Sequence, residues 1–186
     1  MRILGISGSL RRGSHNRRLL RAAAGSLPSG AALVEWDGLA ALPAYDEDLE
    51  ALEPAAVVEL REAIADADAV LIATPEYNSS VPGALKNALD WVSRPFPDNA
   101  LRNKPVLVVG ASTGLFGAVW AQAEVRKVLG AIGAKPLGGE LPVGLAEDAF
   151  ADDGTLADPL LQERLSDLVG ELVDQVDAPL LLRQAA

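Results

Sequence analysis

AVLIATPEYNSSVPGALKNALDWVSR, residues 69–94, places a strand, a loop and a helix in immediate succession. Its first six residues are apolar up to a final threonine, as expected of a strand that is covered on both faces. Pro82 suits the first turn of the helix that follows. The inward-facing stripe of that helix consists of Leu85, Leu89 and Val92. A buried strand followed by an amphipathic helix indicates an α/β fold with a parallel sheet.

The same alternation extends to both sides of this stretch. Further strands are expected at 2–7, 31–36, 105–112 and within 135–144, and further helices at 14–24, 54–66, 117–133 and 156–176, the last capped by Thr155 or Asp158. Five strands alternating with helices predict a three-layer, doubly wound arrangement, in which one five-stranded parallel sheet carries helices on both faces. Because no repeat or boundary is visible, we expect residues 1–186 to form a single domain.

The composition narrows the class of protein. The chain has 186 residues, 49% of them hydrophobic, and is long enough to bury a core. The absence of cysteine excludes disulfides, iron–sulfur clusters and cysteine nucleophiles. A formal charge of −10 disfavours nucleic acid and anionic membranes as partners. The first residues lack the features of a signal peptide and no apolar run is long enough for a membrane span, so we expect a cytoplasmic protein.

Ligands of doubly wound sheets bind beyond the carboxyl ends of the strands, which directs attention to three loops. The first, GISGSLRRGSHN at 5–16, resembles a triphosphate-binding loop, but Ser14 stands where the lysine belongs. Its glycine spacing also differs from that of a dinucleotide-binding turn. The third loop begins with GASTG at 110–114, which matches the nucleophile elbow of hydrolases, but the only histidine, His15, precedes it. We therefore reject an NTPase, a Rossmann-type NAD site and an esterase.

The first loop fits a single phosphate group instead. Backbone N–H groups at the start of a helix, together with the positive end of the helix dipole, form an anion site. Arg11 can add a charge-assisted contact. Neutral donors are available on Ser7, Ser9, Ser14 and Asn16. The alternative is that Ser14 or Asn16 merely caps the helix and that the arginines are solvated, and the first loop alone does not decide between the two.

The other two loops favour a ligand. Pro75 stiffens the turn after the central strand, so that the backbone groups of Glu76, Tyr77 and Asn78 are fixed in direction. Fixed amides suit the polar edge of a flat heteroaromatic ring. In the third loop, small residues let the backbone approach a ligand closely, namely Ser112, Thr113 and Gly114. The three loops together predict one anion site beside two sides of a planar ring.

Taken in order, GISGSLRRGSHN, TPEYNSSVPGALKNALDWVSRP and GASTGLFGAVWAQAEVRKVLGAIGA resemble the NADPH-dependent FMN reductases of flavodoxin-like fold, which include quinone, azo-dye and chromate reductases. The resemblance implies bound FMN. It implies that the phosphate is held by Ser9, Arg11, Ser14 and Asn16, with His15 nearby through its backbone. It also implies that one edge of the isoalloxazine ring is lined by Pro75, Glu76, Tyr77 and Asn78, and the opposite side by Ser112 and Gly114, with Thr113 between them.

The resemblance further implies the activity. Hydride would pass from NADPH or NADH to FMN and then to a small-molecule electron acceptor: a quinone, a flavin, an azo compound or a metal oxyanion. We assign no catalytic side chain and no metal, because the flavin carries the chemistry and Glu76 is not needed as a base. The alternative function is a flavodoxin-like electron carrier that does not itself oxidise NAD(P)H.

Aromatic residues flank the expected pocket, namely Trp91, Phe96 and Trp120. The resemblance implies that a neighbouring subunit completes the site, so we expect a homodimer or homotetramer, although Trp91 also suits the core. Two positions depart from the family's pattern: Ala118 stands where a second glycine is common, and Trp120 where an arginine is common. Both departures concern the nicotinamide or substrate side of the site.

Overall fold

The computed structural model describes the backbone of residues 1–184 and the side chains of residues 1–178. The strands are β1 (Arg2–Ser7), β2 (Ala32–Trp36), β3 (Ala69–Thr74), β4 (Pro105–Ala111), β5 (Lys135–Pro136) and β6 (Pro142–Val143). The α-helices are α1 (His15–Gly25), α2 (Ala55–Ala65), α3 (Gly83–Val92), α4 (Val119–Ala131) and α5 (Pro159–Gln184). Two 3-10 helices, η1 (Leu39–Ala41) and η2 (Glu47–Leu52), lie between β2 and α2. The predicted alternation of strands and helices is confirmed.

The strands form one parallel sheet in the order β2-β1-β3-β4-β5. The central strand β3 is buried along its whole length, as its continuous apolar sequence predicts. β1 pairs with both β2 and β3, so that Gly5 lies opposite Leu71 on one side and Glu35 on the other. This order is that of flavodoxin-like sheets.

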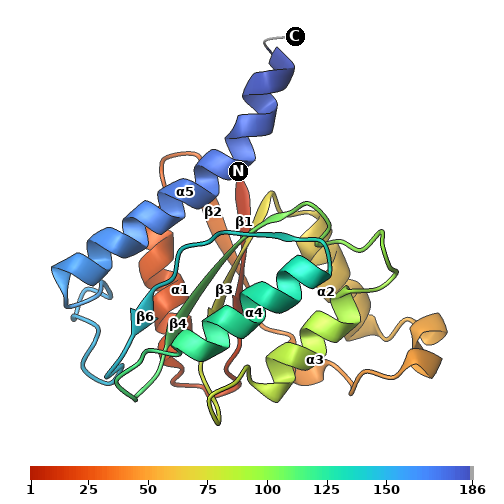
Figure 1. Cartoon of the computed structure of the whole chain (residues 1–186), viewed down its shortest axis with the longest axis horizontal. Coiled ribbons are helices and arrows are strands. Elements are labelled where there is room, and N and C mark those ends of the chain that lie inside the picture. The colour runs from red at the N-terminus through yellow and green to blue at the C-terminus, as the bar shows by residue number, and fades with distance from the viewer. Residues whose placement is uncertain (185–186) are drawn as a thin grey trace.

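Helices cover both faces of the sheet, and each face has its own core (Figure 1). Helices α1 and α5 pack on one face, against side chains such as Ile3, Leu71 and Val109. Helices α2, α3 and α4 pack on the other face, against their alternating neighbours such as Leu4 and Ile72. Because successive side chains of a strand point to opposite faces, continuous apolar strands supply both cores at once.

The last strand differs from the prediction. Residues 135–144 form two short segments instead of one strand, and β5 and β6 pair with opposite ends of β4. Gly138 and Gly139 lie between them, and glycine sustains a strand poorly. The buried side chain of Gln122 bridges the interruption: its Nε2 donates to the Leu141 carbonyl (3.2 Å) and its Oε1 accepts from the Leu141 N–H (3.1 Å). A side chain of α4 thus replaces contacts that a strand would have made.

The helix ends follow local chemistry. Asp158, and not Thr155, caps α5, because its Oδ1 accepts a hydrogen bond from the Leu160 N–H (2.9 Å). Gly133 follows the end of α4 with φ +90°, the left-handed conformation that glycine adopts freely. No helix within the part of the chain that the structure describes combines the length and apolar character needed to cross a bilayer.

Candidate cofactor site

Three loops follow β1, β3 and β4 and lie at the same edge of the sheet (Figure 1). We call residues 8–14 the first loop, 75–82 the second loop and 112–118 the third loop. β1 and β3 are neighbours, but the sheet continues from β1 to β2 on one side and from β3 to β4 on the other. The strand order therefore reverses between β1 and β3, and such a reversal leaves a crevice in which nucleotides bind.

The first loop leads into α1 with its hydroxyl groups turned inward. Ser9 and Ser14 are buried, at 7% and 3% exposed. Ser14 is the N-cap of α1, where its Oγ accepts a hydrogen bond from the Arg17 N–H (3.3 Å). The N–H groups of His15 and Asn16 have no acceptor among the residues that the structure describes. Capping by Ser14 thus leaves two backbone donors free at the positive end of the helix dipole, which fits a phosphate.

The basic stretch divides into two groups. Arg17 pairs with Asp37 (2.5 Å), and Arg21 pairs with Glu35 (3.2 Å), so these arginines are neutralised by the end of β2. Arg11 is exposed in the first loop, where its N–H donates to Ser9 Oγ (3.4 Å). The charge available to an anion at this edge is therefore smaller than the sequence suggests, and Arg11 is the predicted residue that carries it.

His15 is the first residue of α1, one position after the predicted helix start at residue 14, and its ring packs against the protein. The imidazole stacks on Phe150, with ring centroids 6.5 Å apart. The Arg18 guanidinium lies over the Phe150 ring, 4.4 Å from the centroid of that ring. Burial, followed by the charges of Arg11 and Arg18, lowers the pKa of His15, so the imidazole is neutral at pH 7. The backbone of His15 is then its useful part at the site.

Asn16 lies at the predicted place, but its side chain is engaged by the protein. Its Nδ2 donates to the Ala111 carbonyl (2.9 Å) and its Oδ1 accepts from the Ala111 N–H (2.9 Å). Asn16 is 2% exposed and Ala111 1% exposed, so both bonds are shielded from water. The side chain of Asn16 therefore ties the start of α1 to the end of β4, and its backbone N–H is the group left for a ligand.

The second loop is a tight turn, which Pro75 and hydrogen bonds of its own backbone constrain. Pro75 is buried. Tyr77 and Ser80 exchange two backbone hydrogen bonds (3.1 and 3.2 Å), which close a tight turn. The two residues inside the turn, Asn78 and Ser79, have φ +54° and +60°, as in a type I′ turn. Tyr77 is 52% exposed at the tip of this loop.

Glu76 has a structural partner that the sequence did not reveal. Its Oε2 accepts hydrogen bonds from the N–H groups of Trp120 (3.0 Å) and Ala121 (3.1 Å), in the first turn of α4. The N-cap residue Ala118 offers no side-chain acceptor, so Glu76 takes its place. The Glu76 carboxylate is therefore engaged within the protein, as the cap of α4.

The third loop packs its backbone against the segment around β6. Ser112 N–H donates to the Val143 carbonyl (3.0 Å), and Leu145 N–H donates to the Gly114 carbonyl (3.0 Å). A Cβ on Gly117 would lie 2.2 Å from the Pro142 carbonyl carbon. Ser112 is half-buried, whereas Thr113 and Gly114 are exposed. The small residues therefore serve close packing within the protein, and Thr113 and Gly114 remain accessible at the edge.

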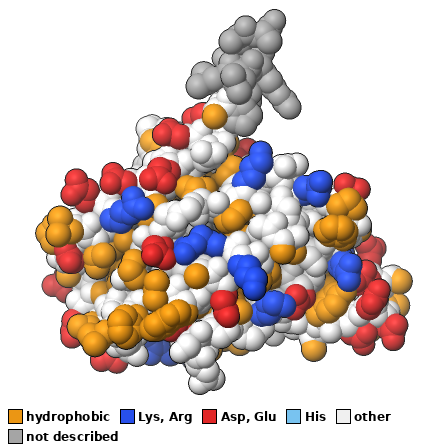
Figure 2. Space-filling model, viewed as in Figure 1, with side chains coloured by type: hydrophobic (Ala, Val, Ile, Leu, Met, Phe, Trp, Pro, Cys, Tyr) orange, Lys and Arg blue, Asp and Glu red, His pale blue; other side chains and the backbone are white. Residues whose placement is uncertain are grey.

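Apolar side chains emerge where the third loop enters α4. Leu115 is 73% exposed, Phe116 62% and Trp120 47%. The rings of Phe116 and Trp120 meet edge to face, with centroids 5.1 Å apart. Figure 2 shows hydrophobic side chains gathered along the lower left of this view, over the start of α4. Trp91 does not belong to this surface, because it is fully buried and its Nε1 donates to the Pro43 carbonyl (2.8 Å).

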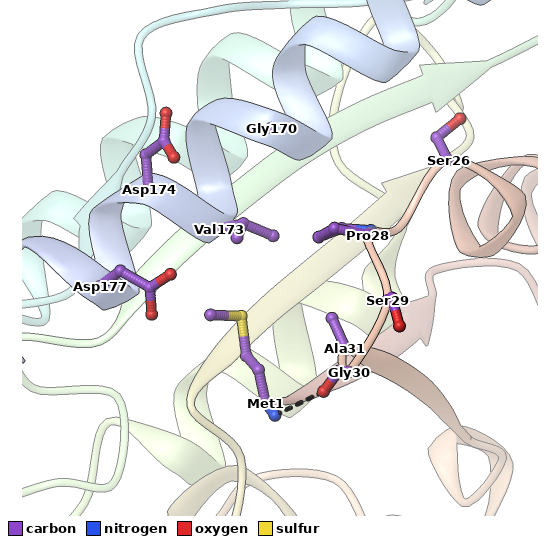
Figure 3. A pocket seen from close by; sticks show the side chains of 10 residues that line it. All are labelled: Met1, Ser26, Pro28, Ser29, Gly30, Ala31, Gly170, Val173, Asp174 and Asp177. Atoms are coloured by element: carbon purple, nitrogen blue, oxygen red, sulfur yellow. Dashed lines mark hydrogen bonds between the residues drawn. The ribbon is translucent and has the colours of Figure 1, made fainter.

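A cavity of about 610 Å³ lies at the opposite edge of the sheet, between α5 and the starts of β1 and β2 (Figure 3). Val173 and Asp177 of α5 face Met1 across it, and the α-amino group of Met1 donates to the Gly30 carbonyl (2.9 Å). No residue predicted for the cofactor lines this cavity. It adjoins the amino ends of the strands, so it is not the candidate cofactor site.

Comparison with known proteins adds independent findings. A family model described as NADPH-dependent FMN reductase matches residues 1–148. An NAD(P)H-dependent FMN reductase of Pseudomonas aeruginosa is 44% identical over 174 residues, which cover 90% of this chain and 93% of the relative. A quinone reductase of Escherichia coli (strain K12) is 42% identical over 131 residues, or 69% of each protein.

A solved structure is similar over nearly the whole fold. FerB, a flavoenzyme NAD(P)H:(acceptor) oxidoreductase from Paracoccus denitrificans, has a TM-score of 0.83 and 34% sequence identity, covering 95% of this chain and 97% of that chain. The family match includes all three loops. This chain belongs to the NADPH-dependent FMN reductase family.

Proposed function

We propose that this protein is an NAD(P)H-driven, FMN-dependent reductase of small-molecule acceptors such as quinones. Family membership supports the reaction class, and relatives at 41–44% identity are named as FMN or quinone reductases. FMN, when bound, accepts hydride from NAD(P)H and passes the electrons to the acceptor. The structural observation that carries the proposal is the pair of open N–H groups at the start of α1, beside two buried hydroxyls and Arg11.

The first loop would hold the phosphate. The backbone N–H groups of His15 and Asn16 and the hydroxyls of Ser9 and Ser14 can all donate to phosphate oxygens. Ser14 Oγ accepts from the Arg17 N–H and lies 3.5 Å from Ser7 Oγ, and its proton can turn to a phosphate oxygen when Ser7 is the donor of that pair. Arg11 supplies a positive charge from the exposed side of the loop. The neutral imidazole of His15 adds no charge, because its pKa is lowered.

The second and third loops would hold the ring. The I′ turn and the buried Pro75 fix the backbone donors and acceptors of residues 76–78, so they need no reorganisation when a ring binds. Thr113 and Gly114 would lie on the other side, because they are the accessible members of the third loop. No side chain is needed as an acid or base, and Glu76 is occupied by the N–H groups of α4.

The exposed apolar cluster supports a homodimer or homotetramer. Leu115, Phe116 and Trp120 lie beside the proposed site, and a second copy covering them would exclude water from the ring. Phe96, 64% exposed, belongs to this proposal, whereas Trp91 does not. We also propose that the chain works as one domain, since both cores share one sheet, and that it acts in the cytoplasm, where NAD(P)H is available.

The first test separates an enzyme from a carrier. The purified protein is loaded with FMN, and NADPH is added without oxygen. The proposal expects the visible absorption to bleach with NADPH alone and to return when a benzoquinone is added. A protein that binds FMN but keeps its colour for hours with NADPH would be an electron carrier. A protein that binds no FMN would refute the proposal.

The second test addresses the phosphate. Arg11→Ala should weaken FMN binding about tenfold while leaving riboflavin binding unchanged, because riboflavin lacks the phosphate. Arg12→Ala is the matched control, since Arg12 is an exposed neighbour in the same loop without an assigned contact. Equal effects of the two variants would indicate only a general attraction by positive charge.

A further inference from the structure

Two carboxylates join the second loop to α4 in opposite directions. From the loop, Glu76 Oε2 accepts from two N–H groups in the first turn of α4 (3.0 and 3.1 Å). From the helix, Glu124 Oε2 accepts from Ser80 Oγ (2.6 Å) and from the Val81 N–H (3.0 Å). We call this pair of side chains the carboxylate clamp. Residues 76–81 are held between its two ends.

The backbone inside the clamp has an unfavourable conformation. Asn78 and Ser79 both have positive φ, a region that side chains with a Cβ disfavour. Type I′ turns prefer glycine at the second of these positions, and this chain has Ser79 there. Such a conformation persists where the surroundings determine it, and Glu124 provides that constraint through Ser80.

The first turn of α4 would also lack hydrogen-bond acceptors for its N–H groups without the second loop. Ala118, the N-cap residue of α4, has φ +61° and makes no side-chain hydrogen bond. The carboxylate of Glu76 satisfies the open N–H groups and complements the positive end of the helix dipole. One of these N–H groups belongs to Trp120, whose ring contacts Phe116. The bond from Glu76 therefore places this aromatic pair close in space to the loop that carries Tyr77.

We propose that Glu76 and Glu124 are positioning residues for the flavin reaction. The clamp fixes the backbone edge at residues 76–78, and it holds the backbone of Trp120 next to the backbone of the second loop, from which the exposed Tyr77 projects. This inference rests on the proposed function, because it requires that the second loop faces FMN. The competing role is purely structural, in which the clamp stabilises α4 and has no influence on the cofactor.

The charge state of the clamp agrees with this role. Hydrogen bonds from the Ser80 hydroxyl and then from the Val81 N–H lower the pKa of Glu124, so its carboxylate stays ionised at neutral pH. An ionised carboxylate accepts both bonds at once, which a protonated one does less well. The turn is therefore held under the conditions in which a reductase would work.

The experiment uses the full chain loaded with FMN and compares Glu76→Ala and Glu124→Ala with Glu171→Ala. Glu171 is the matched control, because it lies in an exposed ion pair with Arg164 on α5, away from the second loop. In both clamp variants we expect the KM for a benzoquinone to rise at least fivefold, and the visible absorption bands and the reduction potential of FMN to shift. The dissociation constant of FMN should change less than threefold, because the phosphate loop is intact. Glu171→Ala should match the wild type in all four measurements.

A rescue variant separates positioning from loss of folding. Ser79→Gly allows the positive φ without strain, so adding it to Glu124→Ala should return the KM at least halfway to the wild-type value. If either alanine variant does not fold, the glutamine variants and this rescue carry the test, because the amide oxygen still accepts hydrogen bonds, although more weakly than a charged carboxylate. A lower melting temperature with unchanged KM, absorption bands and potential would overturn the proposal. If the proposed function itself is wrong, the wild type and Glu171→Ala will also fail to bind FMN or to oxidise NADPH.

Discussion

Removing the Asn16 side chain should destabilise the protein before any cofactor binds. In Asn16→Ala, the N–H and the carbonyl of Ala111 both lose their partner, and Ala111 is only 1% exposed. An unsatisfied buried polar group costs about 1–3 kcal/mol, so two of them give a loss of roughly 2–6 kcal/mol. Water that enters the site reduces this loss, and we expect about 3 kcal/mol. At about 2–4 °C per kcal/mol for a chain of this size, the melting temperature should fall by roughly 6–12 °C.

Urea denaturation of the FMN-free protein, followed by far-UV circular dichroism, measures this loss. Asn99→Ala is the matched control, because Asn99 is also buried and makes the same pair of bonds: Nδ2 to the Ile132 carbonyl (2.9 Å) and Oδ1 from the Leu101 N–H (3.0 Å). Asn99 precedes β4 and therefore lies at the opposite edge of the sheet. Both variants should lose similar stability, but only Asn16→Ala should also weaken FMN binding, because it releases the start of α1.

One result would refute this reasoning. If FMN-free Asn16→Ala unfolds within about 0.5 kcal/mol of the wild type, below the cost of one unsatisfied buried group, the bonds to Ala111 do not hold the loop. A tenfold weaker FMN affinity in that same variant would then mean that the side chain contacts the phosphate directly, as the family resemblance implies. Measuring stability without FMN separates the two roles of Asn16, because only its bonds to Ala111, and not a contact with the phosphate, can act in the cofactor-free protein.

Three further outcomes follow from single contacts. Gln122→Ala should cost roughly 1–3 kcal/mol in urea denaturation, because the Leu141 N–H loses its acceptor while the Leu141 carbonyl still accepts from the Gly110 N–H (3.2 Å), and amide exchange at Leu141 should become faster. Lys104→Met should cost about 1–2 kcal/mol without changing FMN affinity, because the Lys104 ammonium donates to carbonyls at the end of α2, among them that of Ile64 (2.6 Å). The lowered pKa of Glu124 means that its contribution to stability is complete above its ordinary pKa of 4.5 and is lost as the pH falls through the lower folded value. Glu124→Gln should therefore unfold with a weaker pH dependence below pH 4.5 than the wild type, as measured by urea midpoints across that range.

Most of the fold can be predicted because the pattern of apolar residues along each segment distinguishes a strand from a helix. Residues 69–73 are apolar and are followed by Thr74, and the structure buries the strand on both faces. The last strand is the exception, since it is divided into two segments and the Gln122 side chain holds Leu141, which lies between them. A hydrophobic pattern records which residues avoid water, but not which polar side chain bridges a gap between strands.

The sequence also predicts which loops form the site, but not what their side chains contact. Strand ends identify the loops, because parallel strands bring their carboxyl ends to one edge. The partner of Asn16 lies 95 positions along the chain, and that of Glu76 lies 44 positions along. Likewise, Arg17 is neutralised by Asp37, which only the packing of α1 beside β2 brings within reach. Residue type states what a side chain can donate or accept, and tertiary structure decides which partner it meets.

The contacts that sequence could not reveal have a common consequence, because each of them connects a loop, or the helix that follows it, to a neighbouring element. Asn16 ties the first loop to the end of β4, Glu76 ties the second loop to α4, and the Gly114 carbonyl ties the third loop to the segment after β6. A site assembled in this way is ordered when the chain folds, so binding a planar cofactor requires little further loss of conformational freedom. Stability and cofactor affinity are then supplied by the same hydrogen bonds. A substitution at Asn16 should lower both, and a substitution at Asn99, with equal burial and equal bonding, should lower stability alone.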